Sequence, residues 1–395
     1  MGTIAIDYTP AHEQGGGIGR LVRDLVAALA AHDSTSDYRL FVAGTTSHSL
    51  PSSPGSNFVW RPTRINPAWL ARLWQRARVP LPIESFTGPI DLYHATDFVL
   101  PPTRPATRTL LTVHDLSFIR VPEAAPPQLR SYLNSVVPRS VHRADHVIAD
   151  SAATKVDLVN LYHVPETRVS VLLSGVSPHF QRQVEGASQV RARYGIPTRP
   201  YIFSIGTVQP RKNYERIVLA LKRLRESGLD VGLVIAGGRG WLNGPLYQTI
   251  SDTGLNDVVH LIGFADDNDL PTLYSDAVCV AFPSLYEGFG FPVLEGMACG
   301  TPVVTSTVSS LPEVAGDAAL VIDPYDIDAL TEACAALSKT MPCVKRSSSE
   351  VMHRQHASPG RSQRSSYATF TPTSSPERSA IIGIVKEIRY LGDTS

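Results

Sequence analysis

Two glutamates stand in the stretch PSLYEGFGFPVLEGMACGTPVV, residues 283–304, with seven residues between them. Glu287 comes first and Glu295 second, and the residues between them include two glycines and a proline. Glycine lets backbone amides approach a ligand closely, and proline suits the first turn of a helix. We therefore expect Glu287 in a loop and Glu295 in the first turn of the next helix, both facing one pocket. Such carboxylates could hold the vicinal hydroxyls of sugars, although a capping glutamate beside a tight turn would give the same pattern.

A pair of basic residues lies in GTVQPRKN, residues 206–213. Arg211 and Lys212 follow the apolar run YIFSI and precede a segment with helical periodicity. Cations at the carboxyl end of a strand, just before a helix, concentrate positive potential where an anion can bind. A solvated surface pair is the alternative for two basic residues, but their place at an expected ligand edge favours an anion site.

The glycine-rich segment GGGIGR, residues 15–20, follows a strand and opens a helix. Free amides at such a helix start suit a phosphate. The dinucleotide pattern Gly-x-Gly-x-x-Gly fails, because Arg20 stands where its third glycine would be. A ligand loop and a purely structural turn both remain open, and NAD binding is disfavoured.

The elements that must position these residues alternate between short apolar strands and amphipathic helices. In the first half, Leu21, Leu25, Ala28 and Leu29 recur on one helical face, and residues 152–163 also have helical character. This alternation predicts a doubly wound parallel sheet. Its expected strands are residues 3–7, 39–43, 91–94, 109–113, 146–149 and 169–173.

The same pattern starts again at residues 201–205 and continues with expected strands in VGLVIAGG, VVHLIG, AVCVAFPS and TPVVTS. The helix after the first of these strands is expected to be capped by Asn213. The polar segment RYGIPTRP, residues 193–200, is the expected linker. We therefore predict two Rossmann-like halves, residues 1–197 and 198–337. In open α/β sheets ligands bind at the carboxyl ends of the strands, so the site is expected in the cleft between the halves.

Composition excludes several classes of protein. The 395 residues include 36 Lys and Arg and 36 Asp and Glu, which argues against a nucleic-acid binder. The four cysteines form no Cys-x-x-Cys pair, which indicates a reducing compartment and no metal site. No signal peptide is recognisable, and no apolar run approaches the roughly 20 residues that span a bilayer. We expect a cytoplasmic protein that lies, at most, on the inner face of the membrane.

Taken together, these motifs resemble a known family. The segments E-GFGFPVL-E, MACGTPVV and SSLPEVAGDAALVIDP are similar to the nucleotide-sugar site of the retaining GT-B glycosyltransferases of group 1, of glycosyltransferase family 4 type. GTVQPRKN, GGGIGR, VHDLSF (113–118) and ADSAATKVDL (149–158) match the same family in the same order. The resemblance covers roughly residues 3–335, and the two-glutamate segment is its most specific part.

The resemblance implies a role for each matching residue. Glu295 would bind the ribose hydroxyls, and Glu287 those of the transferred sugar. Arg211 and Lys212 would neutralise the departing diphosphate, and His114 would lie beside the sugar ring, a structural histidine being the alternative. The other implied donor-site residues are Gly16, Gly17, Gly19, Gly206, Gly263, Gly288, Phe289, Gly290 and Phe291, and the acceptor pocket would include His94, Asp97 and Asp115.

The chemistry implied is transfer of a sugar from a nucleotide-diphosphate sugar, with GDP-mannose as the donor guessed from the family. Fixed cations and amides stabilise the growing charge of the diphosphate better in the transition state than in the ground state. No Asp-x-Asp metal motif occurs in the sequence, and no metal or cofactor is expected. Retention of configuration by front-face attack is what the family implies. A phosphorylase or synthase on the same fold, and a non-catalytic sugar-nucleotide-binding relic, are the alternatives.

The segment WRPTRINPAWLARLWQRARVP, residues 60–80, contains no acidic residue. Basic helices that contain tryptophan often lie on anionic membranes, whereas packing against the core would explain the same apolar stripe. A membrane contact would imply a lipid-linked acceptor; otherwise the acceptor is a saccharide. The apolar stripe consists of Trp69, Leu70, Leu73, Trp74 and Ala77, and the nearby charges are Arg72, Arg76 and Arg78.

The C-terminal part departs from the family pattern. Residues 338–376 are rich in Ser, Arg and Pro without apolar periodicity, which is typical of disorder. Residues 377–391 recover helical spacing and resemble the family's closing helix. We interpret the segment between as the product of two compensating reading-frame changes. Translating its coding DNA in another frame should yield a sequence with helical periodicity that is rich in Glu, Arg and Leu.

Overall fold

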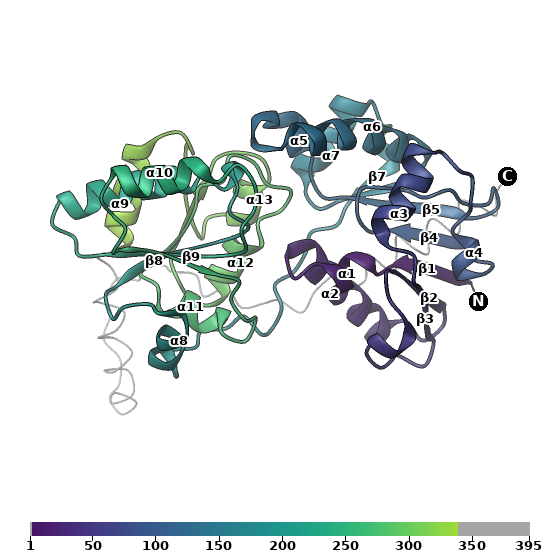
Figure 1. Cartoon of the computed structure of the whole chain (residues 1–395), viewed down its shortest axis with the longest axis horizontal. Helices are drawn as coiled ribbons and strands as arrows, with labels where there is room; N and C mark the ends of the chain where they lie inside the picture. The colour runs from purple at the N-terminus through teal and green to yellow at the C-terminus, as the bar shows by residue number, and fades with distance from the viewer. Residues whose placement is uncertain (1, 339–395) are drawn as a thin grey trace, which may run out of the picture. The chain divides into compact units, whose positions relative to one another are not determined.

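The computed structural model describes residues 2–338, which form two compact units (Figure 1). Unit 1 comprises residues 2–120 and 127–175, and unit 2 comprises residues 121–126 and 176–338. The change of unit therefore falls after Gly175, earlier than the expected position near residue 197, because Val190 and Ile196 pack into the core of unit 2. The segment expected at 338–376, apart from residue 338, and the helix expected at 377–391 lie outside the described residues.

Unit 1 is built on a parallel sheet with the strand order β3-β2-β1-β4-β5-β6-β7. Every pair of neighbours in it is parallel. The order reverses between β1 and β4, where a doubly wound sheet places its ligand crevice. The strands are β1 (Thr3–Asp7), β2 (Asp37–Ala43), β3 (Phe58–Thr63), β4 (Leu92–Ala95), β5 (Arg108–Val113), β6 (His146–Ala149) and β7 (Val169–Val171).

Helices cover both faces of this sheet, because alternate strand residues point to opposite sides. Ile4 and Ile6 of β1 face the stripe Leu25 and Leu29 of α2, whereas Ala5 belongs to the core on the other face. The helices are α1 (Thr9–Glu13), α2 (Gly17–His32), α3 (Pro67–Ala71), α4 (Glu84–Thr87), α5 (Ser117–Arg120), α6 (Pro127–Arg143) and α7 (Ala152–Tyr162), with the short turns η1 (Ser47–Ser49), η2 (Arg72–Arg76) and η4 (Glu166–Arg168).

Unit 2 repeats the architecture with the parallel order β10-β9-β8-β11-β12-β13, which reverses between β8 and β11. Figure 1 shows α9 and α10 on one face of this sheet and α8 and α11 on the other. The strands are β8 (Tyr201–Ile205), β9 (Gly232–Ala236), β10 (Val259–Gly263), β11 (Cys279–Phe282), β12 (Val303–Ser306) and β13 (Leu320–Ile322). The helices are α8 (Ala187–Tyr194), α9 (Tyr214–Glu226), α10 (Gly244–Asp252), α11 (Leu270–Asp276), α12 (Phe291–Ala298) and α13 (Leu311–Ala315), the turn η5 (Pro210–Lys212), and a helix over residues 327–338.

A short piece of chain between α5 and α6 also belongs to unit 2. It contains the turn η3 (Pro122–Ala124). Val121 and Ala124 pack with Tyr286, and the indole Nε1 of Trp241 donates a 2.8 Å hydrogen bond to the carbonyl of Ala124. The chain thus contributes to unit 2 once before it enters that unit at Val176.

The expected strands are all present, and the two that were not expected lie at sheet edges. β3 contains Pro62, which a parallel sheet tolerates at its edge because no further strand needs the missing N–H. β13 has only three residues and ends the other sheet. Among residues 2–338, no helix is both long enough and apolar enough to span a bilayer.

Candidate donor site

The predicted donor-site residues of unit 2 gather at the carboxyl ends of β8 and β11, where the strand order reverses. Arg211 and Lys212 stand in η5, after β8, and Glu287 stands in the loop after β11. The peptide N–H of Leu285 donates a 2.8 Å hydrogen bond to the carbonyl of Arg211, which joins the two loops. Sequence placement and structure agree that this edge carries the charged groups.

Glu287 lies between the two cations. Its Oε2 accepts a 2.7 Å hydrogen bond from Arg211, and its Oε1 accepts one of 2.7 Å from Lys212. All three side chains are at most 15% exposed. The guanidinium of Arg211 also donates to the carbonyl of Tyr286 at 2.7 Å. Two positive charges on one carboxylate leave this cluster with a net positive charge, so it can attract an anion.

The charge state of Glu287 follows from its neighbours. Burial by itself would raise the pKa of the carboxyl group, but Arg211 and Lys212 outweigh burial, and the pKa is lowered. Burial raises the pKa of the nearby Tyr214, which stays a neutral phenol. Its hydroxyl donates a 2.9 Å hydrogen bond to the carbonyl of Gly206, which helps to fix the end of β8.

Gly206 makes room for the side chain of Lys212. Its φ of +143° is a conformation that favours glycine, and a Cβ there would lie 2.9 Å from Cε of Lys212. The ammonium group of Lys212 lies 4.7 Å from the centre of the Phe282 ring, on the last residue of β11. Gly206 thus leaves room for Lys212, and its contact with the donor stays a prediction.

Asn213 occupies the N-cap position of α9, but it does not cap the helix with its side chain. Its φ of +62° is left-handed, and the amide Nδ2 instead donates to the carbonyls of Pro283 and Pro324, both at 2.8 Å. The prediction that the Asn213 side chain caps α9 is therefore wrong. The residue links the loop after β8 to the loop after β11, and so holds the two halves of the cation–carboxylate cluster in place.

The glycine loop after Glu287 leads into α12. Gly290 has a φ of +123°, and a Cβ there would lie 2.8 Å from the Leu311 side chain, so only glycine fits. The hydroxyl of Ser310 donates to the carbonyls of Glu287, at 3.0 Å, and Phe289, at 2.6 Å. The hydroxyl of Ser309 accepts the N–H of Glu287 at 2.9 Å. Gly288, Phe289 and Phe291 thus belong to a fixed loop that ends at the amino end of a helix, where amides lack helical partners.

Glu295 was expected in the first turn of α12, but that turn contains no acidic residue. It lies in the second turn, is 3% exposed, and its Oε2 accepts a 2.6 Å hydrogen bond from the hydroxyl of Tyr274 on α11. The reason is that Phe291 begins the helix, one residue before Pro292. The structure therefore places Glu287 with cations and Glu295 with a buried tyrosine.

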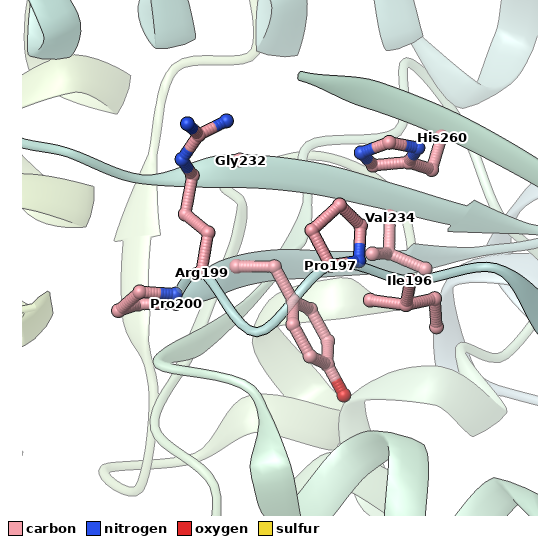
Figure 2. A pocket seen from close by; sticks show the side chains of 8 residues that line it. Ile196, Pro197, Arg199, Pro200, Gly232, Val234 and His260 are labelled. Atoms are coloured by element: carbon pink, nitrogen blue, oxygen red, sulfur yellow. The ribbon is translucent and has the colours of Figure 1, made fainter. Parts of the chain in front are cut away.

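The cavity drawn in Figure 2 lies at the opposite, amino edge of the same sheet. It is a small hollow, partly open to solvent, and Pro197, Arg199 and His260 are among its lining residues. None of the predicted donor-site residues lines it. Gly263, with a φ of +70°, ends β10 on the carboxyl edge, and its contact with the donor stays a prediction.

The glycine-rich loop of unit 1 contains one glycine that packing requires and two that are exposed. A Cβ on Gly19 would lie 2.0 Å from the carbonyl oxygen of Gln14, so this glycine is required for packing. Gly16 is the N-cap of α2 and Gly17 its first residue, and both are exposed. The structural alternative thus explains Gly19, whereas Gly16 and Gly17 remain predicted ligand contacts.

His114 follows β5 and is 5% exposed. Its Nδ1 lies 2.7 Å from Oδ2 of Asp150, and its Nε2 lies 2.9 Å from the carbonyl oxygen of Thr96. Both partners are acceptors, so both ring nitrogens donate and the ring is an imidazolium. Burial would lower the pKa of His114, but Asp150, with Asp97 and the Thr96 carbonyl, raises it to about 9.

The predicted acceptor residues lie around this imidazolium, at the ends of β4 and β5. Asp97 accepts a 3.3 Å hydrogen bond from Nε2 of Gln14, and burial raises its pKa. His94 shares a 2.8 Å hydrogen bond with Thr112, and burial, with His114, lowers its pKa to about 4. Asp115 accepts the N–H of Ser117 at 2.8 Å and so begins α5. His94 and His114 are buried, whereas Asp97 is half-buried, and its charge helps to raise the pKa of His114.

Sequence reasoning missed several residues that hold these sites together. Asp150 and Ser310 were inside quoted motifs but received no role. Their positions could have indicated a role, because both lie at the carboxyl edge of a sheet. Asp150 directly follows β6, and Ser310 precedes α13. Asp7, at the end of β1, was missed as well, and burial raises its pKa to about 6.

Comparison with known proteins identifies the family. Residues 188–347 match the model for glycosyl transferases group 1, and residues 15–180 match the model for glycosyltransferase family 4. The O-antigen chain mannosyltransferase B of Escherichia coli is 32% identical over 329 residues, which are 80% of this chain and 85% of that protein. The MMP alpha-(1->4)-mannosyltransferase of Mycolicibacterium hassiacum is 32% identical over 198 residues, 49% of this chain and 45% of that protein.

Solved structures show the same fold. Sucrose-phosphate synthase from Thermosynechococcus elongatus superposes with a TM-score of 0.65 at 20% identity, over 89% of this chain and 100% of that one. WaaG, a glycosyltransferase involved in lipopolysaccharide biosynthesis, superposes with a TM-score of 0.62 at 17% identity, over 89% of this chain and 94% of that one. At these identities the likeness establishes the architecture, two Rossmann-like domains of the GT-B type.

Proposed function

Because this chain belongs to the group 1 glycosyltransferases, we propose that it moves a mannosyl residue from GDP-mannose to a saccharide or lipid-linked acceptor, with retention of configuration. The observation that carries the proposal is the meeting of Arg211, Lys212 and Glu287 at the switch point of the unit 2 sheet. The mannosyl donor is inferred from the E. coli relative, whose name is that of a mannosyltransferase.

The cations act on the leaving group in this proposal. As the glycosyl–phosphate bond breaks, negative charge grows on the nucleoside diphosphate, and Arg211 and Lys212 already stand where that charge would develop. Preorganised charge of this kind lowers the barrier without reorganisation during the reaction. The amides at the start of α12 would meet the same phosphates. We propose that this arrangement makes a divalent metal unnecessary, so transfer should persist in EDTA.

Glu287 acts on the transferred sugar. An ionised carboxylate offers about four acceptor positions, so it can hold both cations and still accept hydrogen bonds from sugar hydroxyls. Glu295 would bind the ribose from its place on α12. In the retaining reaction the acceptor hydroxyl attacks the anomeric carbon on the face that the diphosphate leaves, and the departing phosphate oxygen takes its proton. In unit 1, the imidazolium of His114 and the carboxylates of Asp97 and Asp115 would bind the sugar and the acceptor.

The first test is binding. Thermal unfolding of the purified full chain is followed with GDP-mannose, UDP-glucose and ADP-glucose, because a ligand that binds the folded state raises its apparent stability. We expect a shift with GDP-mannose alone. A shift only with another nucleotide sugar would reject the donor, and a requirement for free phosphate and a glycan would indicate a phosphorylase. Binding without transfer to any acceptor extract would indicate a non-catalytic relic.

The second test is transfer by Lys212→Ala, which we expect to be roughly 10²–10³-fold slower, the usual loss for one preorganised donor. Lys222→Ala is the matched control, because Lys222 lies on the neighbouring helix α9 and is 45% exposed. The control should retain wild-type turnover. Near-normal turnover of Lys212→Ala would reject the role given to this cation.

A further inference from the structure

A surface segment of unit 1 combines exposed arginines with exposed apolar side chains. It spans residues 64–78, directly after β3, and contains α3 and the π-helical turn η2. We call its outer residues the basic–aromatic face: Arg64, Ile65, Trp69, Arg72, Arg76 and Arg78, all of which are exposed.

The segment is anchored from its inner side. Leu70 is 2% exposed in the core of unit 1, and Nε1 of Trp74 donates a 2.8 Å hydrogen bond to the carbonyl of Leu81. The Trp74 ring also packs edge-on against Phe86, with the ring centres 6.1 Å apart. At the start of α3, Asn66 accepts the N–H of Ala68 at 2.8 Å. The core-packing interpretation thus holds for Leu70 and Trp74, which pack inward, whereas Trp69 is exposed.

Trp69 is 63% exposed, and the guanidinium of Arg72 lies 5.0 Å from the centre of its ring. Ile65, 42% exposed, lies four residues before it, just ahead of Asn66, the N-cap of α3. Tryptophan with apolar neighbours and arginines is the composition of helices that lie at the boundary between lipid head groups and acyl chains. An indole at that depth keeps its polar edge in the head groups while its ring leaves water.

The local charge is one-sided although the chain as a whole is neutral. No aspartate or glutamate occurs between residues 38 and 83, whereas the whole chain contains 36 acidic and 36 basic residues. The first carboxylate after this range, Glu84, is 4% exposed and accepts hydrogen bonds from the Arg104 N–H and the Thr107 hydroxyl. The exposed charge of this segment is therefore positive, which complements an anionic surface.

We propose that the basic–aromatic face binds the surface of an anionic lipid bilayer, with Trp69 and Ile65 at head-group depth and the four arginines on lipid phosphates. The inference is independent of the proposed transfer activity, because binding to vesicles is measured without donor or acceptor. It would bring the enzyme to the surface that holds a lipid-linked acceptor.

The experiment is co-sedimentation of the full chain with vesicles of phosphatidylcholine alone and with 30% phosphatidylglycerol. We expect binding to the anionic vesicles only, falling steeply between 0.05 and 0.5 M salt because the attraction is screened. Each arginine near an anionic surface strengthens partitioning roughly fivefold. Arg72→Gln with Arg76→Gln should therefore weaken it roughly thirtyfold. Trp69→Ser should weaken binding on its own and leave the salt dependence unchanged.

Matched controls lie elsewhere on the described surface. Phe264→Ser removes a ring that is 63% exposed, the same fraction as Trp69, but belongs to unit 2. Arg104→Gln with Arg182→Gln removes two exposed charges outside the face. Controls that bind as wild type, with the face variants weakened and equally stable to heat, support the proposal. Absence of wild-type binding, equal loss in the controls, or tighter binding to heparin or RNA than to vesicles would overturn it.

Discussion

Glu287→Gln is the most informative substitution in unit 2. The change keeps the shape of the side chain but removes the one negative charge between Arg211 and Lys212, each 2.7 Å away. Because these groups are at most 15% exposed, water cannot replace the lost partner. Removing one member of a buried ion pair typically costs about 3–5 kcal/mol of stability. For a domain of this size, such a loss lowers the unfolding midpoint by roughly 6–20 °C.

The pH dependence has a definite sign. The pKa of Glu287 is lowered in the folded protein, so its contribution is complete above the ordinary carboxyl pKa and is lost as the pH falls through the folded value. The gap between wild type and Glu287→Gln should therefore be full at pH 7 and should close in acid, below about pH 4. Burial opposes the lowering, but the two cations dominate.

The assay must distinguish the two units, because a two-domain chain need not unfold in one step. Hydrogen exchange of peptides covering β8 and β11 reports the stability of unit 2 directly. Glu226→Gln is the matched control: Glu226 forms an exposed i,i+4 pair with Lys222 on α9, and its loss should cost at most about 0.5 kcal/mol. A loss below about 1 kcal/mol for Glu287→Gln would refute the account of a buried, charge-dependent cluster.

Two further predictions concern the residues that hold the sites. Asp150→Asn should lower the pKa of His114 from about 9 toward its ordinary value, which an NMR titration of the ring would detect. In the wild type, the raised pKa contributes stability that is complete below about pH 6 and is lost as the pH rises through about 9; a flat stability curve there would contradict the imidazolium assignment. Asn213→Ala should leave the carbonyls of Pro283 and Pro324 without their donor and cost roughly 1–3 kcal/mol for each, measured by denaturant unfolding. Asn243→Ala, which removes a 3.4 Å contact to Gly240, should cost far less.

The local sequence pattern was sufficient to predict the strands that are buried on both faces of a sheet. The run at residues 201–205 is apolar except for Ser204, and it forms the central strand β8. β3 escaped prediction because its apolar run, residues 58–60, ends at Arg61 after three residues, and Pro62 argues against a strand unless it lies at an edge. Edge position is a property of the sheet, not of the segment, so the segment alone could not reveal it.

The donor site was predicted in its position but not in its pairing. Placement at strand ends brought Arg211, Lys212 and Glu287 to one edge, yet nothing in their spacing indicated that both cations would bind the same carboxylate. Glu295 lies one turn further along α12 than predicted, because the helix begins at Phe291. The bond from His114 to Asp150 joins residues 36 apart in the chain, and only the order of β5 and β6 brings them together.

The short excursion at residues 121–126 limits how the protein can be cut into parts. A fragment that starts at Val176 would contain every strand of the second sheet but would lack Val121 and Ala124. Its Tyr286 would lose the apolar cover on its ring, one residue from Glu287, and the Trp241 indole would lose its carbonyl acceptor. A fragment of unit 2 for ligand studies therefore needs residues 121–126 grafted onto it. Otherwise the full chain must be used.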